Sequence, residues 1–232
     1  MSAKNNRAWN LPVQDPIEHS PEMHSDSRWK TAGWLIFTLL LTIHFALSYS
    51  AILDYLNLRD YTHGLSPVPY QYRALPMFIF RLLVGTHFIA AATKHAPAPL
   101  NNPYQLVQFG IAFFALLGAV FATSGTITRL TGNCTFSRWF SLLIVYMAYF
   151  NLAPTWGLSY SFPYDPPSLM FFAIGVYLTV SNRIWLYYLV FPLAVLNRET
   201  ICFLTIFFII WKLEKLRERA PALTAKRVSP IL

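Results

Sequence analysis

The chain carries few charged residues: only 12% of its 232 residues are Asp, Glu, Lys or Arg, against about 25% in ordinary soluble domains. It has two cysteines, Cys134 and Cys202, which are too far apart in the sequence to form a metal-binding pair. Its 9 glycines form no phosphate-binding loop. It also lacks a nucleophile elbow, a zinc spacing, a haem motif and any nucleic-acid-binding motif. These absences argue against a soluble nucleotide-dependent or zinc-dependent enzyme.

Apolar residues are abundant instead, at 55% hydrophobic and 17% aromatic residues, which is typical of an integral membrane protein. A hydrocarbon core about 30 Å thick requires roughly 20 apolar residues per helix. The sequence therefore predicts an all-α fold, a polytopic transmembrane helix bundle. The apolar stretches are residues 31–53, 74–93, 104–128, 139–153, 167–181 and 183–213.

The last of these stretches, residues 183–213, is interrupted by Asn197-Arg198-Glu199-Thr200. Ionisable groups at membrane depth cost about 2.5–3.5 kcal/mol each on insertion scales, so they mark a site or a buried pair. As one helix the stretch would be about 46 Å long, which exceeds the membrane core. We therefore predict two short helices that meet at this break.

The stretch 74–93 is ambiguous, because Arg81 and His87 interrupt it. If it lies flat on the outer surface and the N-terminus is inside, 13 Lys and Arg residues are inside and 5 are outside. If it spans, the counts are 6 and 11, and a seven-span arrangement with the N-terminus outside gives 11 and 6. The seven-span arrangement is weaker, because it requires the basic N-terminal tail to cross the membrane without a signal peptide. The positive-inside rule favours the first arrangement: about six spans, an interfacial helix in the first outer loop, and both termini cytoplasmic.

The two ends of the chain differ from its apolar middle. Residues 1–30 are polar, contain three prolines and lack the apolar core of a signal peptide, so we expect a disordered cytoplasmic tail. Residues 31–213 form the predicted transmembrane domain. Residues 214–232 form a basic cytoplasmic tail, suited to contact with anionic membrane lipids.

Two carboxylates, Asp54 and Asp60, flank the end of the first predicted span. A carboxylate at that place could serve as a general base or help to hold a divalent metal. The plain alternative is a charge at a helix end, or a partner for Arg59. The sequence contains no recognisable set of metal ligands and does not identify a cofactor.

The segment Tyr70-Gln71-Tyr72-Arg73 is framed by prolines and lies within the predicted outer loop. Arginine suits bidentate phosphate binding, so the segment is a candidate site for a lipid phosphate. Its plain reading is an aromatic belt at the membrane surface with a snorkelling arginine.

Two further segments are candidates. Tyr164 and Asp165 precede two prolines at a span, where Asp165 could bind substrate or simply stabilise a helix start. Asn197, Arg198 and Glu199 interrupt the last stretch and could form either an anion site or an ion pair between neighbouring helices. We expect Arg198 and Glu199 to lie within reach of Arg73.

This layout resembles the GT-C type of integral-membrane glycosyltransferases, which use polyprenyl-phosphate sugars. The resemblance rests on a cytoplasmic N-terminus, one span, an outer loop (residues 54–103) with acidic residues, and the segment Tyr70-Gln71-Tyr72-Arg73 followed by Leu75-Pro76. It implies sugar transfer on the extracytoplasmic face, with Asp54 or Asp60 deprotonating the acceptor. Arg73 and Arg198 would then hold the phosphate. Members of the family are usually much longer and carry closely spaced acidic pairs, which this chain lacks.

Two other functions remain open: a non-enzymatic membrane subunit of a larger complex, and a small transporter with its site at the broken helix. A transporter of that kind predicts inverted repeats, which the sequence does not display. The expected partners are a lipid-linked sugar, membrane lipids and a membrane protein, with no nucleic acid. The expected location is a bacterial inner membrane.

Overall fold

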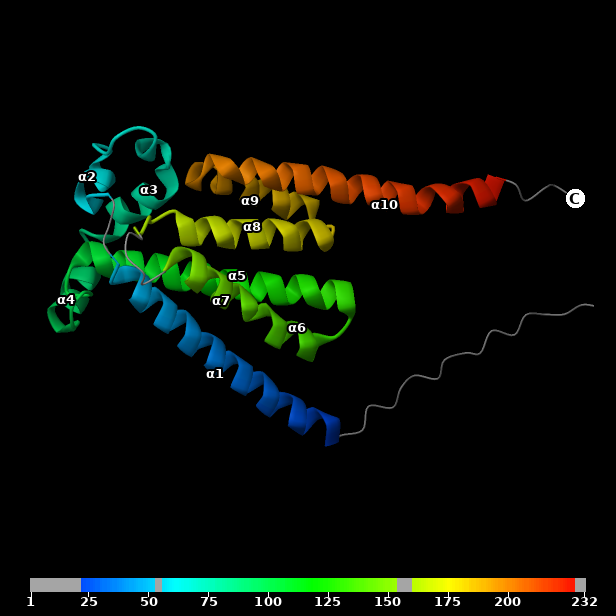
Figure 1. Ribbon diagram of the computed structural model, residues 1–232, viewed down its shortest axis with the longest axis horizontal. Coiled ribbons are helices and arrows are strands. Elements are labelled where there is room, and N and C mark those ends of the chain that lie inside the picture. Colours follow the sequence, from blue (N-terminus) through cyan, green and yellow to red (C-terminus); the bar gives the residue numbers. More distant parts are fainter. Residues whose placement is uncertain (1–21, 53–55, 154–159, 228–232) are drawn as a thin grey trace, which may run out of the picture.

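The computed structural model describes residues 22–52, 56–153 and 160–227, and leaves out the side chains of residues 22–27, 71 and 218–227. The prediction of an all-helical chain is confirmed for this part (Figure 1). The helices, in chain order, are α1 (Glu22–Ser50), α2 (Leu58–His63), η1 (Tyr70–Tyr72), α3 (Ala74–Leu83), α4 (His87–His95), α5 (Pro103–Thr131), α6 (Cys134–Ser141), α7 (Leu143–Leu152), α8 (Asp165–Val180), α9 (Ile184–Asn197), η2 (Glu199–Cys202) and α10 (Phe203–Arg227).

The long helix α5 is the centre of the bundle. It packs against α1 and α8, and the consecutive helices α6 and α7 also lie along it. Helix α8 in turn packs against α9 and α10 (Figure 1). Small residues on α5 allow close packing, because Ala112 and Ala119 are fully buried.

Two helices are long and apolar enough to cross a membrane: Arg28–Ser50 within α1, and α5. A third span is counted if the bent pair α3 and α4 is taken as one. Helices α8 and α9 are apolar but shorter, 16 and 14 residues, or about 24 and 21 Å. The described helices are thus consistent with an integral membrane protein, and the six-span arrangement stays a prediction.

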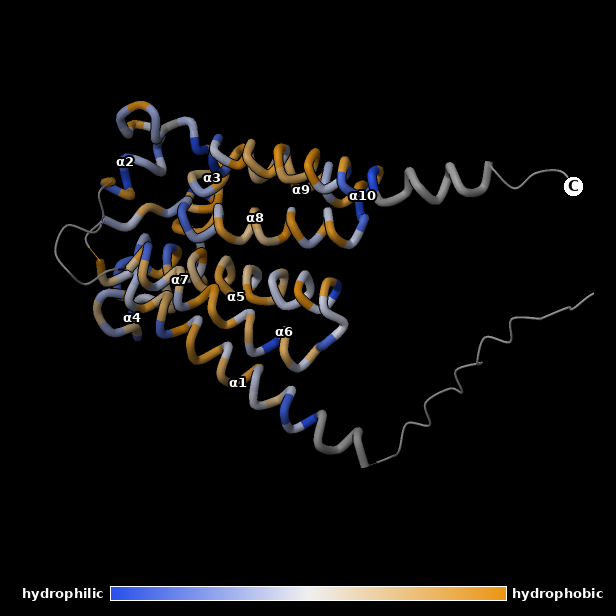
Figure 2. Tube along the Cα trace, turned by 45° about the vertical axis from the view of Figure 1, so that its right-hand side comes forward, coloured by the Kyte–Doolittle hydropathy of each residue, from blue (hydrophilic) through white to orange (hydrophobic). Residues whose placement is uncertain are grey.

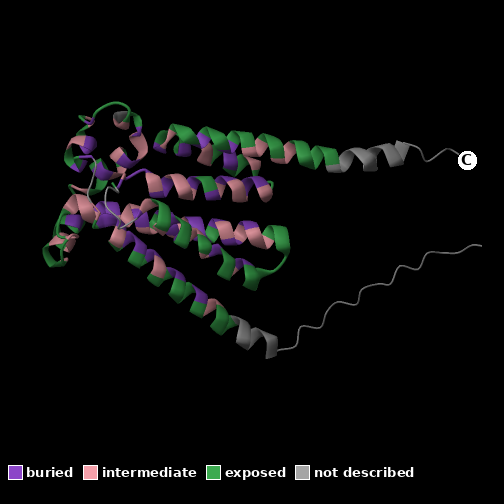
Figure 3. Ribbon diagram, viewed as in Figure 1, coloured by how far each residue is buried: buried purple, intermediate pink, exposed green. Residues whose placement is uncertain are grey.

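The surface of the bundle is apolar, as an environment of lipid requires. Trp185, Phe150 and Leu189 are 88%, 70% and 65% exposed. Figure 2 shows apolar residues along the helix shafts and hydrophilic ones gathered towards the helix ends. Figure 3 shows exposed residues over much of α1 and α10, and buried ones where α5 meets α8. So extensive an exposed apolar surface marks contact with a membrane or a partner rather than with water.

The stretch 74–93 differs from the single flat helix that we predicted. It forms two short helices, α3 and α4, whose axes are bent by 79°. Gly85 lies in the break, and the Thr86 hydroxyl accepts a hydrogen bond from the Ile89 amide at 3.4 Å, which starts α4. A glycine followed by a Thr cap favours a new helix start over a continuous helix.

Helix α1 begins at Glu22, so residues 22–30 of the predicted disordered tail are helical. Similarly, α10 continues to Arg227, beyond residue 213 where we placed the end of the transmembrane domain. Both helices therefore extend past the apolar stretch that predicted them.

The predicted break near residue 198 is confirmed. Helix α9 ends at Asn197, Arg198 is extended (φ −160°, ψ 132°), and η2 leads into α10 at Phe203. The chain reverses there, so that α9 and α10 lie beside α8 (Figure 1). The reversal brings Glu199 beside Arg73, at the end of the bundle where α2 and α3 lie (Figure 1).

The opposite end of the bundle holds the basic residues of the first and last helices. There the Arg138 Nη1 atom donates to Thr31 Oγ1 at 2.6 Å, which joins α6 to α1. The Lys212 Nζ atom donates to Asn182 Oδ1 at 2.7 Å, which joins α10 to the turn after α8. The start of α1 and the far part of α10 therefore lie at the end of the bundle opposite to α2 and α3 (Figure 1).

Candidate functional site

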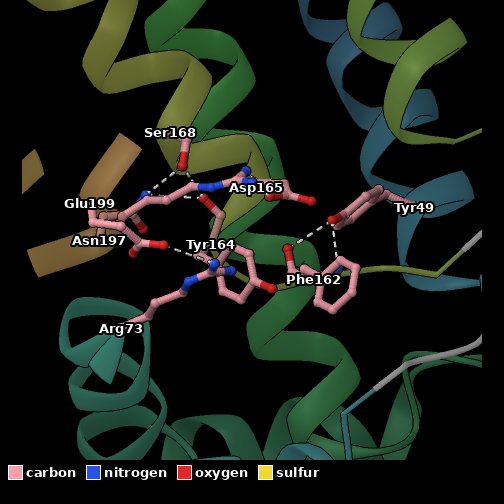
Figure 4. Close-up of polar contacts among 9 residues, drawn as sticks. Tyr49, Arg73, Phe162, Tyr164, Asp165, Ser168, Asn197 and Glu199 are labelled. Carbon is pink, nitrogen blue, oxygen red and sulfur yellow. Dashed lines mark hydrogen bonds and ion pairs between the residues drawn. The ribbon is translucent and has the colours of Figure 1, made fainter. Parts of the chain in front are cut away.

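Three segments that are distant in the sequence meet at one end of the bundle: residues 70–73, the start of α8, and the break between α9 and α10. Their charged side chains are Arg73, Asp165, Arg198 and Glu199, which we call the arginine–carboxylate cluster. Figure 4 labels Arg73, Asp165 and Glu199. The expected proximity of Glu199 to Arg73 is confirmed by an ion pair at 3.3 Å. These segments come together because the break at residue 198 returns the chain to the end where α8 begins.

The Arg73 side chain is held from several sides and is only 8% exposed. Its guanidinium lies over the Tyr164 ring, 3.7 Å from the ring centroid, a distance at which cation–π attraction is favourable. Its backbone carbonyl accepts a hydrogen bond from the Tyr61 hydroxyl at 2.7 Å. The Nε atom is buried without a hydrogen-bond partner. Arg73 therefore has a fixed position and one unused donor.

Arg198 pairs with Asp165 at the start of α8. The Arg198 Nη1 atom lies 2.6 Å from Asp165 Oδ1, and the two side chains are 33% and 16% exposed. The Arg198 guanidinium also faces the Tyr164 ring at 5.7 Å. The adjacent charges Arg198 and Glu199 do not neutralise each other, because Glu199 pairs with Arg73 and Asp165 with Arg198. The cluster as a whole has two positive and two negative charges.

Asn197 ties the end of α9 to the start of α8 and is fully buried. Its Nδ2 atom donates to the Tyr164 carbonyl at 3.0 Å and to Ser168 Oγ at 2.8 Å. Its Oδ1 atom has no hydrogen-bond partner. Asn197 therefore fixes the backbone from which Arg198 projects, and retains one unused acceptor.

Aromatic rings pack against Tyr164, the ring that the arginines of the cluster face. Phe162 stacks on Tyr164 at 5.3 Å and on Tyr70 at 5.8 Å. The Tyr49 hydroxyl, from the end of α1, donates to the Phe162 carbonyl at 2.7 Å and accepts from the Phe162 amide at 2.9 Å (Figure 4). We did not predict Tyr49, Phe162 or Ser168 as site residues, because each joins the site through a partner that is distant in the sequence: Phe162 for Tyr49, Tyr70 for Phe162 and Asn197 for Ser168. A buried hydroxyl bound to both polar atoms of one residue fixes that residue's backbone firmly.

The pKa values of the two carboxylates of the cluster are shifted in opposite directions. Burial raises the pKa of Asp165 above its ordinary value, and the nearby Arg198 and Arg73 guanidinium groups oppose this only in part. The pKa of Glu199 is lowered, first by the hydrogen bond from its own backbone amide and then by Arg73. Burial also raises the pKa of the Tyr164 hydroxyl. Asp165 is thus the carboxylate of the cluster that is better suited to accept a proton.

A cavity of about 440 Å³ opens beside the Asp165–Arg198 pair. It lies between α7, α8 and the start of α10, and its polar walls come from Asn151, Asp165, Ser168, Arg198 and Thr200. This volume falls within the range of about 300–1,000 Å³ that is usual for ligand pockets. The pair is therefore accessible to a small polar group, while Arg73 is not.

The remaining candidate residues lie elsewhere or outside the described part. Asp60 lies in the first turn of α2 and lines neither this cavity nor the apolar one described below. Tyr72 is 68% exposed. Asp54 and the side chain of Gln71 lie outside the described residues. Among the described residues, no three His, Cys, Asp or Glu side chains are grouped to hold a metal ion.

The chain matches no protein-family model, no curated protein and no solved structure. The interpretation of the site therefore depends on its geometry and chemistry.

Proposed function

We propose that this chain is a small integral-membrane transferase of the glycosyltransferase type, which moves a sugar from a polyprenyl-phosphate donor to an acceptor hydroxyl. The observation that carries the proposal is the Asp165–Arg198 pair at 2.6 Å on the wall of a 440 Å³ cavity. An arginine and a carboxylate of raised pKa, next to each other in a cavity, supply the phosphate-binding group and the proton acceptor that such a transfer requires.

Arg198 is the group that binds the donor phosphate. It is one-third exposed, lines the cavity, and retains an Nε atom without a hydrogen-bond partner. The planar guanidinium can donate two parallel hydrogen bonds to phosphate oxygens. Arg73 is more deeply buried and stacked on Tyr164, and so stabilises the same end of the bundle by its charge without contacting the donor.

Asp165 is the general base in this proposal. The acceptor hydroxyl gives its proton to the Asp165 carboxylate while its oxygen forms a bond to the anomeric carbon. The bond between that carbon and the phosphate oxygen breaks, and the electron pair leaves with the polyprenyl phosphate, where Arg198 stabilises the added charge. Asp54 and Asp60, the carboxylates that the family resemblance suggested, stay predictions.

The membrane arrangement that we propose has six spans, both termini in the cytoplasm, and the cluster on the extracytoplasmic side of a bacterial inner membrane. It is supported by Arg138 and Lys212, which make hydrogen bonds near the start of α1 and after the end of α8, whereas the cluster lies where α8 begins. Basic residues near span ends favour the cytoplasmic side.

A second candidate is a non-enzymatic subunit of a membrane complex. It is favoured by the neutrality of the cluster, in which each arginine already has a carboxylate partner. Such closed pairs can serve only to hold helices in position. In that case the charges would stabilise the bundle and bind nothing.

The exchange of the two charges, Arg198→Asp with Asp165→Arg, separates the candidates. The unaltered chain, in nanodiscs with a panel of polyprenyl-phosphate sugars, is expected to transfer sugar, and the exchanged variant to stay folded but lose transfer. Arg59→Gln, an exposed arginine in α2, is the matched control and should keep full transfer. Full transfer by the exchanged variant, or no transfer by the unaltered chain, would overturn the enzyme proposal and leave the subunit.

A further inference from the structure

A second cavity, of about 480 Å³, shares no lining residue with the first. Its walls come from α3, α4, α5 and the start of α8, and among the described residues that line it Asn197 is the only one with a polar side chain. Phe88 and Phe114, which also line it, are 78% and 68% exposed on the apolar surface of the bundle. The cavity is therefore open towards the apolar surface of the bundle, and Asn197 is the polar residue among those that line it.

The side-chain oxygen of Asn197, Oδ1, is a hydrogen-bond acceptor that no donor contacts. Its Nδ2 atom is engaged by the Tyr164 carbonyl and Ser168 Oγ, while Oδ1 is buried and unpartnered in a side chain of zero exposure. The reversed orientation of the amide would place its oxygen against the Tyr164 carbonyl, which is also an acceptor. The orientation is thus fixed by chemistry, and Oδ1 is left as a buried acceptor without a donor.

We infer that this cavity binds a neutral lipid alcohol, with its hydrocarbon chain along the apolar walls and its hydroxyl donating to Asn197 Oδ1. No charged residue lines the cavity among those described, so a phosphate or ammonium group inside it would be buried without a partner. A plain hydrocarbon would pack against the apolar walls but would leave Asn197 Oδ1 without a donor. A hydrocarbon chain with one uncharged hydroxyl both packs against the walls and supplies the donor. This site is distinct from the phosphate site at Arg198, and its occupancy does not depend on sugar transfer.

The test uses the full chain in nanodiscs and two photoreactive probes, a long-chain primary alcohol and its methyl ether, which can accept but not donate a hydrogen bond. The alcohol is expected to label peptides of α3, α5 or α8, with about tenfold higher affinity than the ether, the ratio that one hydrogen bond to a buried acceptor provides. Asn197→Leu should remove that preference. Because Asn197 also holds α8, folding of this variant is checked by circular dichroism.

A second variant keeps the test decisive if Asn197→Leu does not fold. Gly110 lines the cavity, and a Cβ at that position would meet no atom within 4 Å. Gly110→Leu should therefore fill the cavity without distorting α5, and reduce labelling by both probes. Gly33→Leu is the matched control, because Gly33 on α1 has equal space but does not line the cavity. Equal binding of alcohol and ether to the unaltered chain, labelling spread over all lipid-facing helices, or labelling unaffected by Gly110→Leu would overturn the inference.

Discussion

Arg198 and Asp165 are 33 residues apart in the sequence, yet Arg198 Nη1 lies 2.6 Å from Asp165 Oδ1. The contact exists because α8 and α9 run in opposite directions and the chain breaks immediately after Asn197. It joins a charge at the end of one helix to a charge at the start of another. The position of this pair in a cavity, rather than between closely packed helices, is what gives it a functional interpretation.

The topology predicts opposite accessibility for residues at the two ends of the bundle. Single cysteines at positions 72, 165 and 183, in a chain whose Cys134 and Cys202 are replaced by serine, should react from two sides. Position 72 is used because Tyr72 is 68% exposed, whereas Arg73 is buried. A membrane-impermeant maleimide added outside intact cells should label positions 72 and 165 and leave 183 unlabelled. Labelling of 72 and 183 from the same side would contradict the arrangement of spans.

Removal of the Tyr49 hydroxyl should destabilise the site without altering its charges. Tyr49→Phe loses both hydrogen bonds to the Phe162 backbone, and leaves these buried groups unpaired at a cost of about 1–3 kcal/mol in the free energy of unfolding. Denaturation by SDS in mixed micelles measures this. Tyr146→Phe, at a tyrosine that is 66% exposed, is the control and should change stability by less than about 0.5 kcal/mol.

The close approach of α8 to α10 should make Gly175 sensitive to a single methyl group. A Cβ there would lie 2.9 Å from Leu204 Cγ, and Leu204 is fully buried, so overpacking should cost about 1–3 kcal/mol. Gly110→Ala, where a Cβ meets nothing within 4 Å, should be neutral or stabilising. Equal stabilities of the two variants in the same assay would mean that α10 does not pack against α8 as the structure places it.

Some features of the fold and the site could be predicted from the sequence, and others could not. The break at Asn197 could be predicted, because four polar residues interrupt an apolar stretch too long for one span. The bend between α3 and α4 could not be predicted. A single glycine and a threonine, Gly85 and Thr86, are a weaker signal in an apolar stretch than the ionisable residues Arg81 and His87. The partner of each arginine was also beyond prediction. Adjacent charges at 198 and 199 suggest a mutual pair, whereas the chain reversal points them at different neighbours.

The raised pKa of Asp165 gives the site a defined pH dependence. Since folding raises this pKa, the contribution of Asp165 to stability is full below its ordinary value of 3.8 and is lost as the pH rises through the raised value. The carboxylate form, which accepts the proton in the proposed transfer, is populated above that raised value. Infrared difference spectra should therefore contain a protonated carboxyl band that persists above pH 3.8 and disappears in Asp165→Asn. A band that titrates at or below 3.8 would contradict the effect of burial.

The affinity of Arg198→Lys for a polyprenyl phosphate tests the central claim most directly. Lysine keeps the positive charge and its pairing with Asp165, but it cannot donate two parallel hydrogen bonds to a phosphate. In nanodiscs, the account predicts that the folded variant binds the lipid phosphate about tenfold more weakly than the unaltered chain, the loss expected for one charge-assisted hydrogen bond. Unchanged affinity in a folded Arg198→Lys variant would contradict the assignment of Arg198 as the phosphate-binding residue.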